Sequence, residues 1–143
     1  MVNRKIRIIN GPNLNLLGTR EPDIYGKATF EDELTGFQNE FPKLVIDYFQ
    51  SNVEGELINS LHEAARVKEG VILNAGAYTH TSIALGDAIK AIDIPVIEVH
   101  ISNIFSREDF RHVSYIAPYC KGSILGFGMD SYRLALKYFE AYF

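Results

Sequence analysis

The chain has 143 residues, which is enough to bury one hydrophobic core but too short for two comfortable domains. We therefore predict one domain over residues 1–143. The net charge of -4 argues against a nucleic-acid-binding protein, because such proteins need a strongly basic surface to displace counterions from phosphates. The single cysteine, Cys120, cannot form an internal disulfide, and no Cys/His cluster has metal-ligand spacing. We interpret Cys120 as a small buried apolar residue.

The N-terminal sequence MVNRKIRIIN interleaves cations with isoleucines and lacks a continuous apolar stretch. No later run approaches the length of a membrane span. We therefore expect a cytoplasmic protein.

The first predicted strand, Ile6–Asn10, leads into a segment without helical or strand periodicity, Asn10–Gly26. This segment carries Arg20 and Tyr25 between the glycines at 18 and 26. Long irregular loops in compact domains are usually lids or binding loops. A loop that carries a cation and a phenol is therefore a candidate for chemistry.

Helices and strands alternate after this loop. Thr29 is predicted to cap a helix that ends before Pro42. The elements that follow are strand Leu44–Gln50, a helix after Asn52 with Leu57, Ile58, Leu61 and Ala65, strand Gly70–Asn74, helix Thr81–Ile92, strands Pro95–Val99 and Gly122–Gly126, and helix Asp130–Phe143 with Leu134, Leu136 and Tyr138.

This alternation, with nearly continuous apolar strands, indicates a parallel sheet that helices cover on both faces. We predict an α/β fold, a flavodoxin-like three-layer sandwich with a five-stranded parallel sheet. In such sheets, ligands bind outside the carboxyl ends of the strands, where the strand order reverses.

Amides, imidazoles and hydroxyls are concentrated at three of these ends, in the segments 10–13, 74–80 and 98–103. Turn chemistry alone explains each Asn or His taken singly, so only their joint placement favours a site. Arg107 and Arg111, four residues apart, would share one face if their segment is helical. Together these residues predict a cationic pocket for a small anion, and the phosphate-binding pattern GxxxxGK[ST] is absent from the sequence.

Several long motifs resemble the type II 3-dehydroquinate dehydratases. They are NGPNLNLLGTREPDIYG, SNVEGELINSLHEA, NAGAYTHTSIALGDAI, EVHISNIFSREDFRHVSY and GFGMDSYRLAL, which together cover nearly the whole chain. The resemblance implies a lyase that reversibly removes water from 3-dehydroquinate, giving 3-dehydroshikimate in the shikimate pathway of aromatic amino-acid biosynthesis. It also implies that no metal or organic cofactor is needed.

By this resemblance, Tyr25 is the base that takes a proton from the carbon beside the substrate ketone. A free tyrosine has a pKa near 10, so lowering it by two to three units requires roughly 3 to 4 kcal/mol. A cation about 4 Å away can supply on the order of 4 kcal/mol before desolvation, and the resemblance assigns this role to Arg20, with Arg107 as a possible second cation. Asn13 is implied to hold a water that stabilises the enolate oxygen.

The resemblance makes His100 the general acid that protonates the departing hydroxyl. Glu98 is two residues earlier on the predicted strand, so period-two alternation places both side chains on one face and favours a carboxylate-imidazole pair. Around the substrate the resemblance places Asn74, His80, Arg107 and Arg111, with Ile101 and Ser102 binding the carboxylate. Arg111 is implied to bind a ring hydroxyl.

The resemblance also implies a homo-oligomer, a dodecamer built from trimers, in which Asp87 reaches the site of a neighbouring subunit. The chain departs from many relatives at Val53, Gly86 and Phe105. A glycine within a helix costs about 1 kcal/mol relative to alanine, so Gly86 is expected to loosen the helix that bears Asp87.

Three other classes of protein are weighed against this interpretation. A lysine Schiff-base dehydratase needs a desolvated amine, and no lysine falls within a predicted buried strand. A serine hydrolase could use Ser102 and His100, but the GxSxG motif is absent from the sequence. A flavodoxin-like flavin- or small-anion-binding module without dehydratase activity is the main alternative, because fold alone does not specify activity.

Overall fold

Five parallel strands form one sheet, in the order β2-β1-β3-β4-β5, in a computed structural model that describes residues 3–19 and 28–142. The strands are β1 (Arg4–Asn10), β2 (Leu44–Gln50), β3 (Gly70–Asn74), β4 (Val96–His100) and β5 (Gly122–Leu125). The predicted α/β, flavodoxin-like fold class is confirmed, and each strand bound lies within two residues of its prediction. The strand order reverses between β1 and β3, because β2 lies on one side of β1 and the later strands lie on the other. A ligand is expected at this point.

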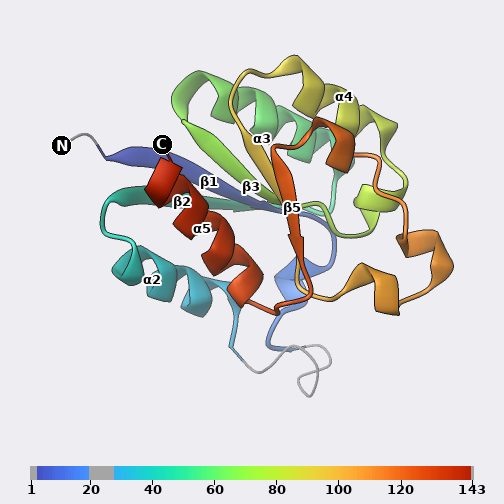
Figure 1. The fold of residues 1–143 in the computed structure, drawn as a ribbon, viewed down its shortest axis with the longest axis horizontal. Helices are drawn as coiled ribbons and strands as arrows, with labels where there is room; N and C mark the ends of the chain where they lie inside the picture. Colours follow the sequence, from blue (N-terminus) through green and yellow to red (C-terminus); the bar gives the residue numbers. More distant parts are fainter. Residues whose placement is uncertain (1–2, 20–27, 143) are drawn as a thin grey trace.

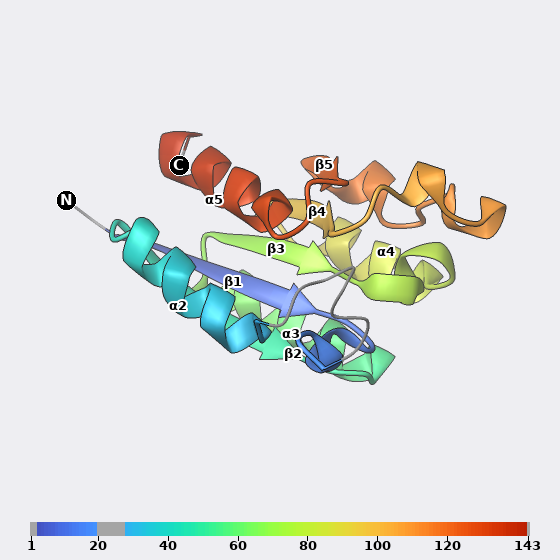
Figure 2. The same ribbon diagram turned by 90° about the horizontal axis from the view of Figure 1, so that it is seen from below.

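Two helices cover each face of the sheet. Figures 1 and 2 show α2 (Phe30–Glu40) and α5 (Asp130–Tyr142) on one face, and α3 (Glu54–Val67) and α4 (Ile83–Ala91) on the other. The core is divided accordingly, because Ile6 and Ile8 of β1 pack in the α2/α5 layer whereas Ile9 packs in the α3/α4 layer. Strands buried on both faces explain the nearly continuous apolar runs of the sequence.

Local capping sets where the helices begin. Thr29 forms the predicted cap, since its hydroxyl accepts from the backbone N–H of Asp32 and the Asp32 carboxylate accepts from the N–H of Thr29. α4 begins two residues later than predicted, because the Ser82 hydroxyl caps it by accepting from the N–H of Leu85 at 2.9 Å. The residues before it, Gly76–His80, form a short 3-10 turn, η2.

The apolar residues that marked the last helix in the sequence do not all lie in the core. Leu134 is 41% exposed, whereas Tyr132, Ala135, Leu136 and Phe139 form the buried side of α5. A tyrosine replaces the expected leucine in the core because its hydroxyl finds two amide partners there. The predicted end of this helix, Phe143, lies outside the described residues.

The segment after β1 is not wholly irregular, since Leu14–Leu16 form a 3-10 turn, η1. Leu17 then packs into the α2/α5 layer of the core. The two residues that made this loop a candidate for chemistry, Arg20 and Tyr25, lie outside the described residues.

Gly86 permits a close contact with α4 that was not foreseen from the sequence, and the expected loosening of this helix stays a prediction. A Cβ atom at this position would lie 2.7 Å from the backbone oxygen of Tyr115. Glycine therefore allows the chain around Tyr115 to pack directly against α4.

Candidate active site

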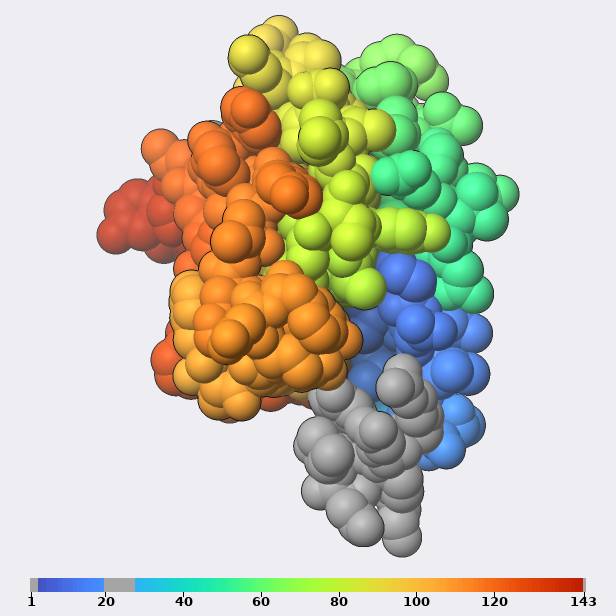
Figure 3. All heavy atoms as spheres, turned by 90° about the vertical axis from the view of Figure 1, so that its right-hand side faces the viewer, coloured from blue at the N-terminus to red at the C-terminus, as the bar shows by residue number. Residues whose placement is uncertain are grey.

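A pocket of about 170 Å³ lies at the carboxyl ends of β1, β3 and β4. Figure 3 looks onto this edge of the sheet, where the segments that follow these three strands lie next to one another. The pocket brings together most of the residues predicted for the site, namely Asn13, Asn74, His80, His100, Ile101, Ser102, Arg107 and Arg111. A volume this small suits a single small molecule.

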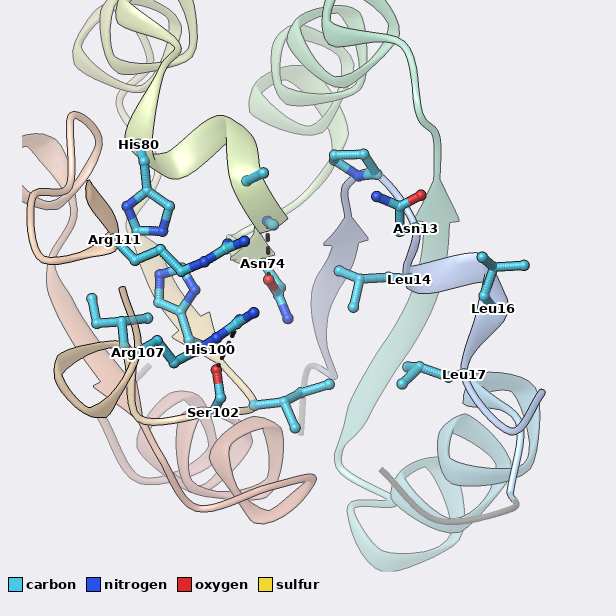
Figure 4. Close-up of a pocket in the computed structure, with 15 residues that line it drawn as sticks. Asn13, Leu14, Leu16, Leu17, Asn74, His80, His100, Ser102, Arg107 and Arg111 are labelled. Atoms are coloured by element: carbon cyan, nitrogen blue, oxygen red, sulfur yellow. Dashed lines mark hydrogen bonds between the residues drawn. The ribbon is translucent and has the colours of Figure 1, made fainter. Parts of the chain in front are cut away.

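The pocket has a polar and an apolar side. Figure 4 shows the histidines, arginines and Ser102 on one side, and Leu14, Leu16 and Leu17 across from them. These leucines come from the turn after β1, in a loop that sequence reasoning singled out for Asn13, Arg20 and Tyr25 and not for its leucines. Their signal was the motif NLNLLG, in which apolar residues recur within a segment otherwise interpreted as a loop.

His100 and Glu98 form the predicted pair at the end of β4. Nε2 of His100 lies 2.8 Å from Oε2 of Glu98, and the two residues are only 5% and 1% exposed. The contact confirms the expected placement of both side chains on one face of the strand. A carboxylate that accepts from Nε2 fixes the tautomer and the orientation of the ring.

Two serines also donate to the Glu98 carboxylate. Ser114 donates to Oε2 at 2.7 Å, and Ser123 donates to Oε1. Burial alone would raise the pKa of Glu98, but the hydrogen bonds from His100, Ser123 and Ser114 outweigh it and hold the pKa below its ordinary value. Sequence reasoning missed both serines, because only the folded chain brings them to the carboxylate.

Cys120 lies near the same carboxylate and is partly buried, whereas we expected it from the sequence to be buried. Burial, together with the negative charge of Glu98, raises the pKa of the Cys120 thiol to about 12. The thiol is therefore protonated at neutral pH and is a poor nucleophile.

His80 is fixed by a backbone carbonyl. Its Nδ1 lies 2.8 Å from the oxygen of Val113, and because a carbonyl only accepts, Nδ1 carries the proton. Partial burial lowers the pKa of His80, and the positive charges of His100 and Arg111 act in the same direction. The ring stacks on that of His100 with centroids 6.2 Å apart, so a neutral imidazole lies beside the paired one.

Arg107 and Arg111 reach the pocket without sharing a helix face. Their segment forms two 3-10 turns, η3 (Ile104–Ser106) and η4 (Asp109–Arg111), so the continuous helix on which a shared face would depend is not formed. Nε of Arg111 donates to Glu108 at 3.2 Å, and Nη1 of Arg107 donates to the Ser102 hydroxyl at 3.4 Å. The two guanidinium groups bring positive charge to the pocket, and the Glu108 carboxylate lies within 3.7 Å of Nε of Arg107 and 3.2 Å of Nε of Arg111.

The serine-hydrolase alternative receives no support from this geometry. The Ser102 hydroxyl accepts from Arg107, whereas Nε2 of His100 is bonded to Glu98. A nucleophilic serine needs its hydroxyl hydrogen-bonded to a basic histidine nitrogen. No lysine lines the pocket within the described ranges, so the Schiff-base alternative receives no support either.

Asn74 is held by a buried network that links three elements. Its Nδ2 donates to the hydroxyl of Tyr132 on α5 at 2.9 Å, and that hydroxyl donates to Oδ1 of Asn10 at the end of β1 at 2.8 Å. Oδ1 of Asn74 accepts from the N–H of Gly76. Tyr132 was missed as a supporting residue, because its motif GFGMDSYRLAL gives no sign that the ring lies beneath the pocket.

Asn13 lies at the rim of the pocket in a left-handed backbone conformation, with φ of 69°. Its backbone N–H donates to Oδ1 of Asn52 at 3.0 Å. Asparagine tolerates this conformation better than most residues, which explains how a side-chain amide can be placed at so tight a turn.

Asp87 does not line this pocket but is exposed on α4. Within residues 3–19 and 28–142, no group of three or more His, Cys, Asp or Glu side chains could hold a metal ion. In the same part of the chain, no helix is both long enough and apolar enough to cross a membrane.

The chain is similar to known proteins over almost its whole length. The profile of the family described as Dehydroquinase class II matches residues 4–140. A 3-dehydroquinate dehydratase from Caldicellulosiruptor bescii is 54% identical over 93% of this chain and 94% of its own length. One from Rhizobium johnstonii is 58% identical over 92% of each chain.

The fold matches as well. The crystal structure of a type II dehydroquinase from Butyrivibrio crossotus superposes with a TM-score of 0.92 at 41% identity, covering 96% of this chain and 98% of that one. Sequence and structure thus point to the same family along the same residues. The chain belongs to the class II dehydroquinase family.

Proposed function

We propose that this chain is a lyase that catalyses the reversible trans-dehydration of 3-dehydroquinate to 3-dehydroshikimate through an enolate, within the shikimate pathway. The observation that carries the proposal is the buried Glu98–His100 pair beside two arginines in a pocket of about 170 Å³. An imidazole paired with a carboxylate can deliver a proton at neutral pH, and the arginines suit an anionic substrate.

In the first step, the Tyr25 phenolate takes a proton from the carbon beside the ketone, and the electron pair of that C–H bond moves onto the carbonyl oxygen as an enolate. Arg20 stabilises the phenolate by its charge. Asn13 holds a water that donates to the enolate oxygen, since such a charge needs donors already oriented toward it.

In the second step, the enolate electrons form the new carbon–carbon double bond while the C–O bond to the tertiary hydroxyl breaks. His100 gives that hydroxyl its proton, so it leaves as water. Glu98 stabilises the imidazolium beforehand. Exchange with solvent then returns a proton to His100 and removes one from Tyr25.

The remaining predicted residues bind the substrate in this proposal. Ile101 and Ser102 bind its carboxylate, Arg111 a ring hydroxyl, and Asn74, His80 and Arg107 complete the contacts. We further propose that residues 1–143 form one domain and assemble as a dodecamer of trimers. There, Asp87 on the exposed side of α4 approaches the pocket of a neighbouring subunit.

The test is an absorbance assay, because the product has a conjugated double bond and the substrate does not. Purified protein incubated with 3-dehydroquinate should show a rise in ultraviolet absorbance. Tyr25→Phe should abolish the rise while substrate binding, measured by calorimetry, changes little. No rise with the wild-type protein would refute the proposed activity, and normal turnover by the phenylalanine variant would exclude Tyr25 as the base.

A further inference from the structure

Residues 113–115 form a short segment between η4 and η5 (Ala117–Tyr119). This segment contacts His80 and the Glu98 carboxylate that is paired with His100. The backbone oxygen of Val113 accepts from Nδ1 of His80 at 2.8 Å. The hydroxyl of Ser114 donates to Oε2 of Glu98 at 2.7 Å, and this is the same oxygen that lies 2.8 Å from Nε2 of His100. Two consecutive residues thus contact His80, which ends the turn η2, and the carboxylate that holds His100 of β4.

The third residue of the segment ties it to the turn that carries His80. The N–H of Tyr115 donates to the backbone oxygen of Thr79 at 2.8 Å. The backbone oxygen of Tyr115 faces Gly86 of α4, where a Cβ atom would come within 2.7 Å. The next residue, Ile116, is fully buried. The segment is therefore fixed from both sides.

The Ser114 hydroxyl has its direction set by its other partners. It accepts from the N–H of Ala117 at 3.0 Å and of Ile116 at 3.3 Å. These two donors occupy its acceptor positions, which leaves its own proton for Glu98. The two backbone N–H groups that follow the serine therefore orient its hydroxyl proton toward the carboxylate of Glu98.

We propose that residues 113–115 act as one positioning segment for both active-site histidines, with Ser114 as its decisive side chain. This inference rests on the proposed dehydratase function. Ser114 orients the carboxylate that orients His100, while the backbone on either side of it fixes the tautomer and the place of His80. Loss of the hydroxyl would disturb proton delivery by His100 and substrate binding by His80 together.

Ser123 provides a matched comparison, because it donates to the other oxygen of the same carboxylate. Ser123 belongs to β5, and its removal leaves residues 113–115 in place. A further control is Ser60, a buried serine of α3 whose hydroxyl accepts from Arg7 at 3.3 Å and which is not part of the pocket lining. Ser123→Ala and Ser60→Ala each remove one of these hydrogen bonds, whereas Ser114→Ala removes the bond to Glu98 together with the two bonds that hold the chain at Ile116 and Ala117.

The experiment measures kcat, KM and the thermal midpoint of each variant by the same ultraviolet assay. Ser114→Ala should lower kcat on the order of 10-fold, as expected for loss of a hydrogen bond to a charged group, and should also raise KM. Ser123→Ala should lower kcat with KM unchanged. Ser60→Ala should lower the thermal midpoint alone. Ser114→Thr, which keeps the hydroxyl, should recover both constants.

Wild-type kcat and KM in Ser114→Ala would overturn the inference, and so would an equal rise of KM in Ser123→Ala or no recovery in a folded Ser114→Thr. If the alanine variant does not fold, Ser114→Cys repeats the test, because a thiol keeps the shape but is a weak donor. An inactive wild-type protein would instead refute the proposed function, so the two failures are distinguishable.

Discussion

Glu98 and His100 are two residues apart on β4, and their side chains meet at 2.8 Å in a place that solvent hardly reaches. A charged carboxylate in such a place is stable only because every partner around it donates. The side chain therefore remains ionised below the pH range in which a free glutamate protonates.

Replacing Glu98 by glutamine should lower kcat by at least about tenfold, because the shape is kept but the charge that stabilises imidazolium is lost. KM should change less, since Glu98 does not itself line the pocket. Steady-state kinetics near neutral pH would check this. An unchanged kcat would show that the carboxylate is dispensable for proton delivery.

The same carboxylate predicts how stability depends on pH. Its pKa is lower in the folded chain than the ordinary value of 4.5, so its contribution is complete above pH 4.5 and is lost as the pH falls through the lower folded value. When the free energy of unfolding is plotted against pH, the uptake of one such proton increases the slope by at most about 1.4 kcal/mol per pH unit. Urea titrations from pH 3 to 6 should therefore give a steeper slope for wild type than for Glu98→Gln, and equal slopes would contradict the shift.

Asn13 allows backbone and side-chain contributions to be separated. Asn13→Ala should destabilise the fold by about 1 to 2 kcal/mol, because alanine resists a φ of 69°. Asn13→Gly accepts that conformation, so it should unfold near the wild-type midpoint. Both variants should lose turnover if the amide holds the water on the enolate. Full activity in the glycine variant would remove that role.

Gly86→Ala should lower the thermal midpoint even though alanine favours helices by about 1 kcal/mol. The added methyl group meets the backbone oxygen of Tyr115 at 2.7 Å. Gly36 is the control, since it lies within α2 with nothing within 4 Å of the added atom. Gly36→Ala should raise the thermal midpoint. A similar rise for Gly86→Ala would show that the backbone at Tyr115 moves away from the added methyl group at little cost.

Tyr132→Phe should destabilise the fold by about 1 to 3 kcal/mol, because the buried Nδ2 of Asn74 and Oδ1 of Asn10 each lose their hydrogen bond to the hydroxyl. KM should rise as well, since Asn74 is then free to rotate away from the pocket. Denaturation and kinetics on one preparation would measure both effects. A destabilised variant with normal KM would mean that Gly76 alone holds the Asn74 amide.

The strands could be predicted because β-branched runs buried on both faces leave a clear pattern. The pairing of Glu98 with His100 also followed from the sequence, since period-two alternation acts within a single strand. The two serines that hydrogen-bond to this pair could not be predicted from the sequence. Ser114 and Ser123 reach the carboxylate only through tertiary packing, which local patterns do not encode.

Arg107 and Arg111 show a second reason for failure. Their place beside the pocket was predicted from chain order, but the assumed helix was replaced by two short 3-10 turns. Tyr132 shows a third reason. Its hydroxyl is buried because it bonds to Asn10 and Asn74, which are far apart in the sequence and become neighbours only when β1 pairs with β3. The periodicity of apolar residues in the sequence carries no information about such hydrogen-bond partners.

Cys120 has a practical consequence for measurements in solution. Its thiol, the only one in the sequence, is held protonated beside Glu98. A cysteine introduced at exposed Thr19, just past the leucine-lined rim, would react with a maleimide far faster at neutral pH. A fluorophore could thus be attached next to the pocket without replacing the native residue.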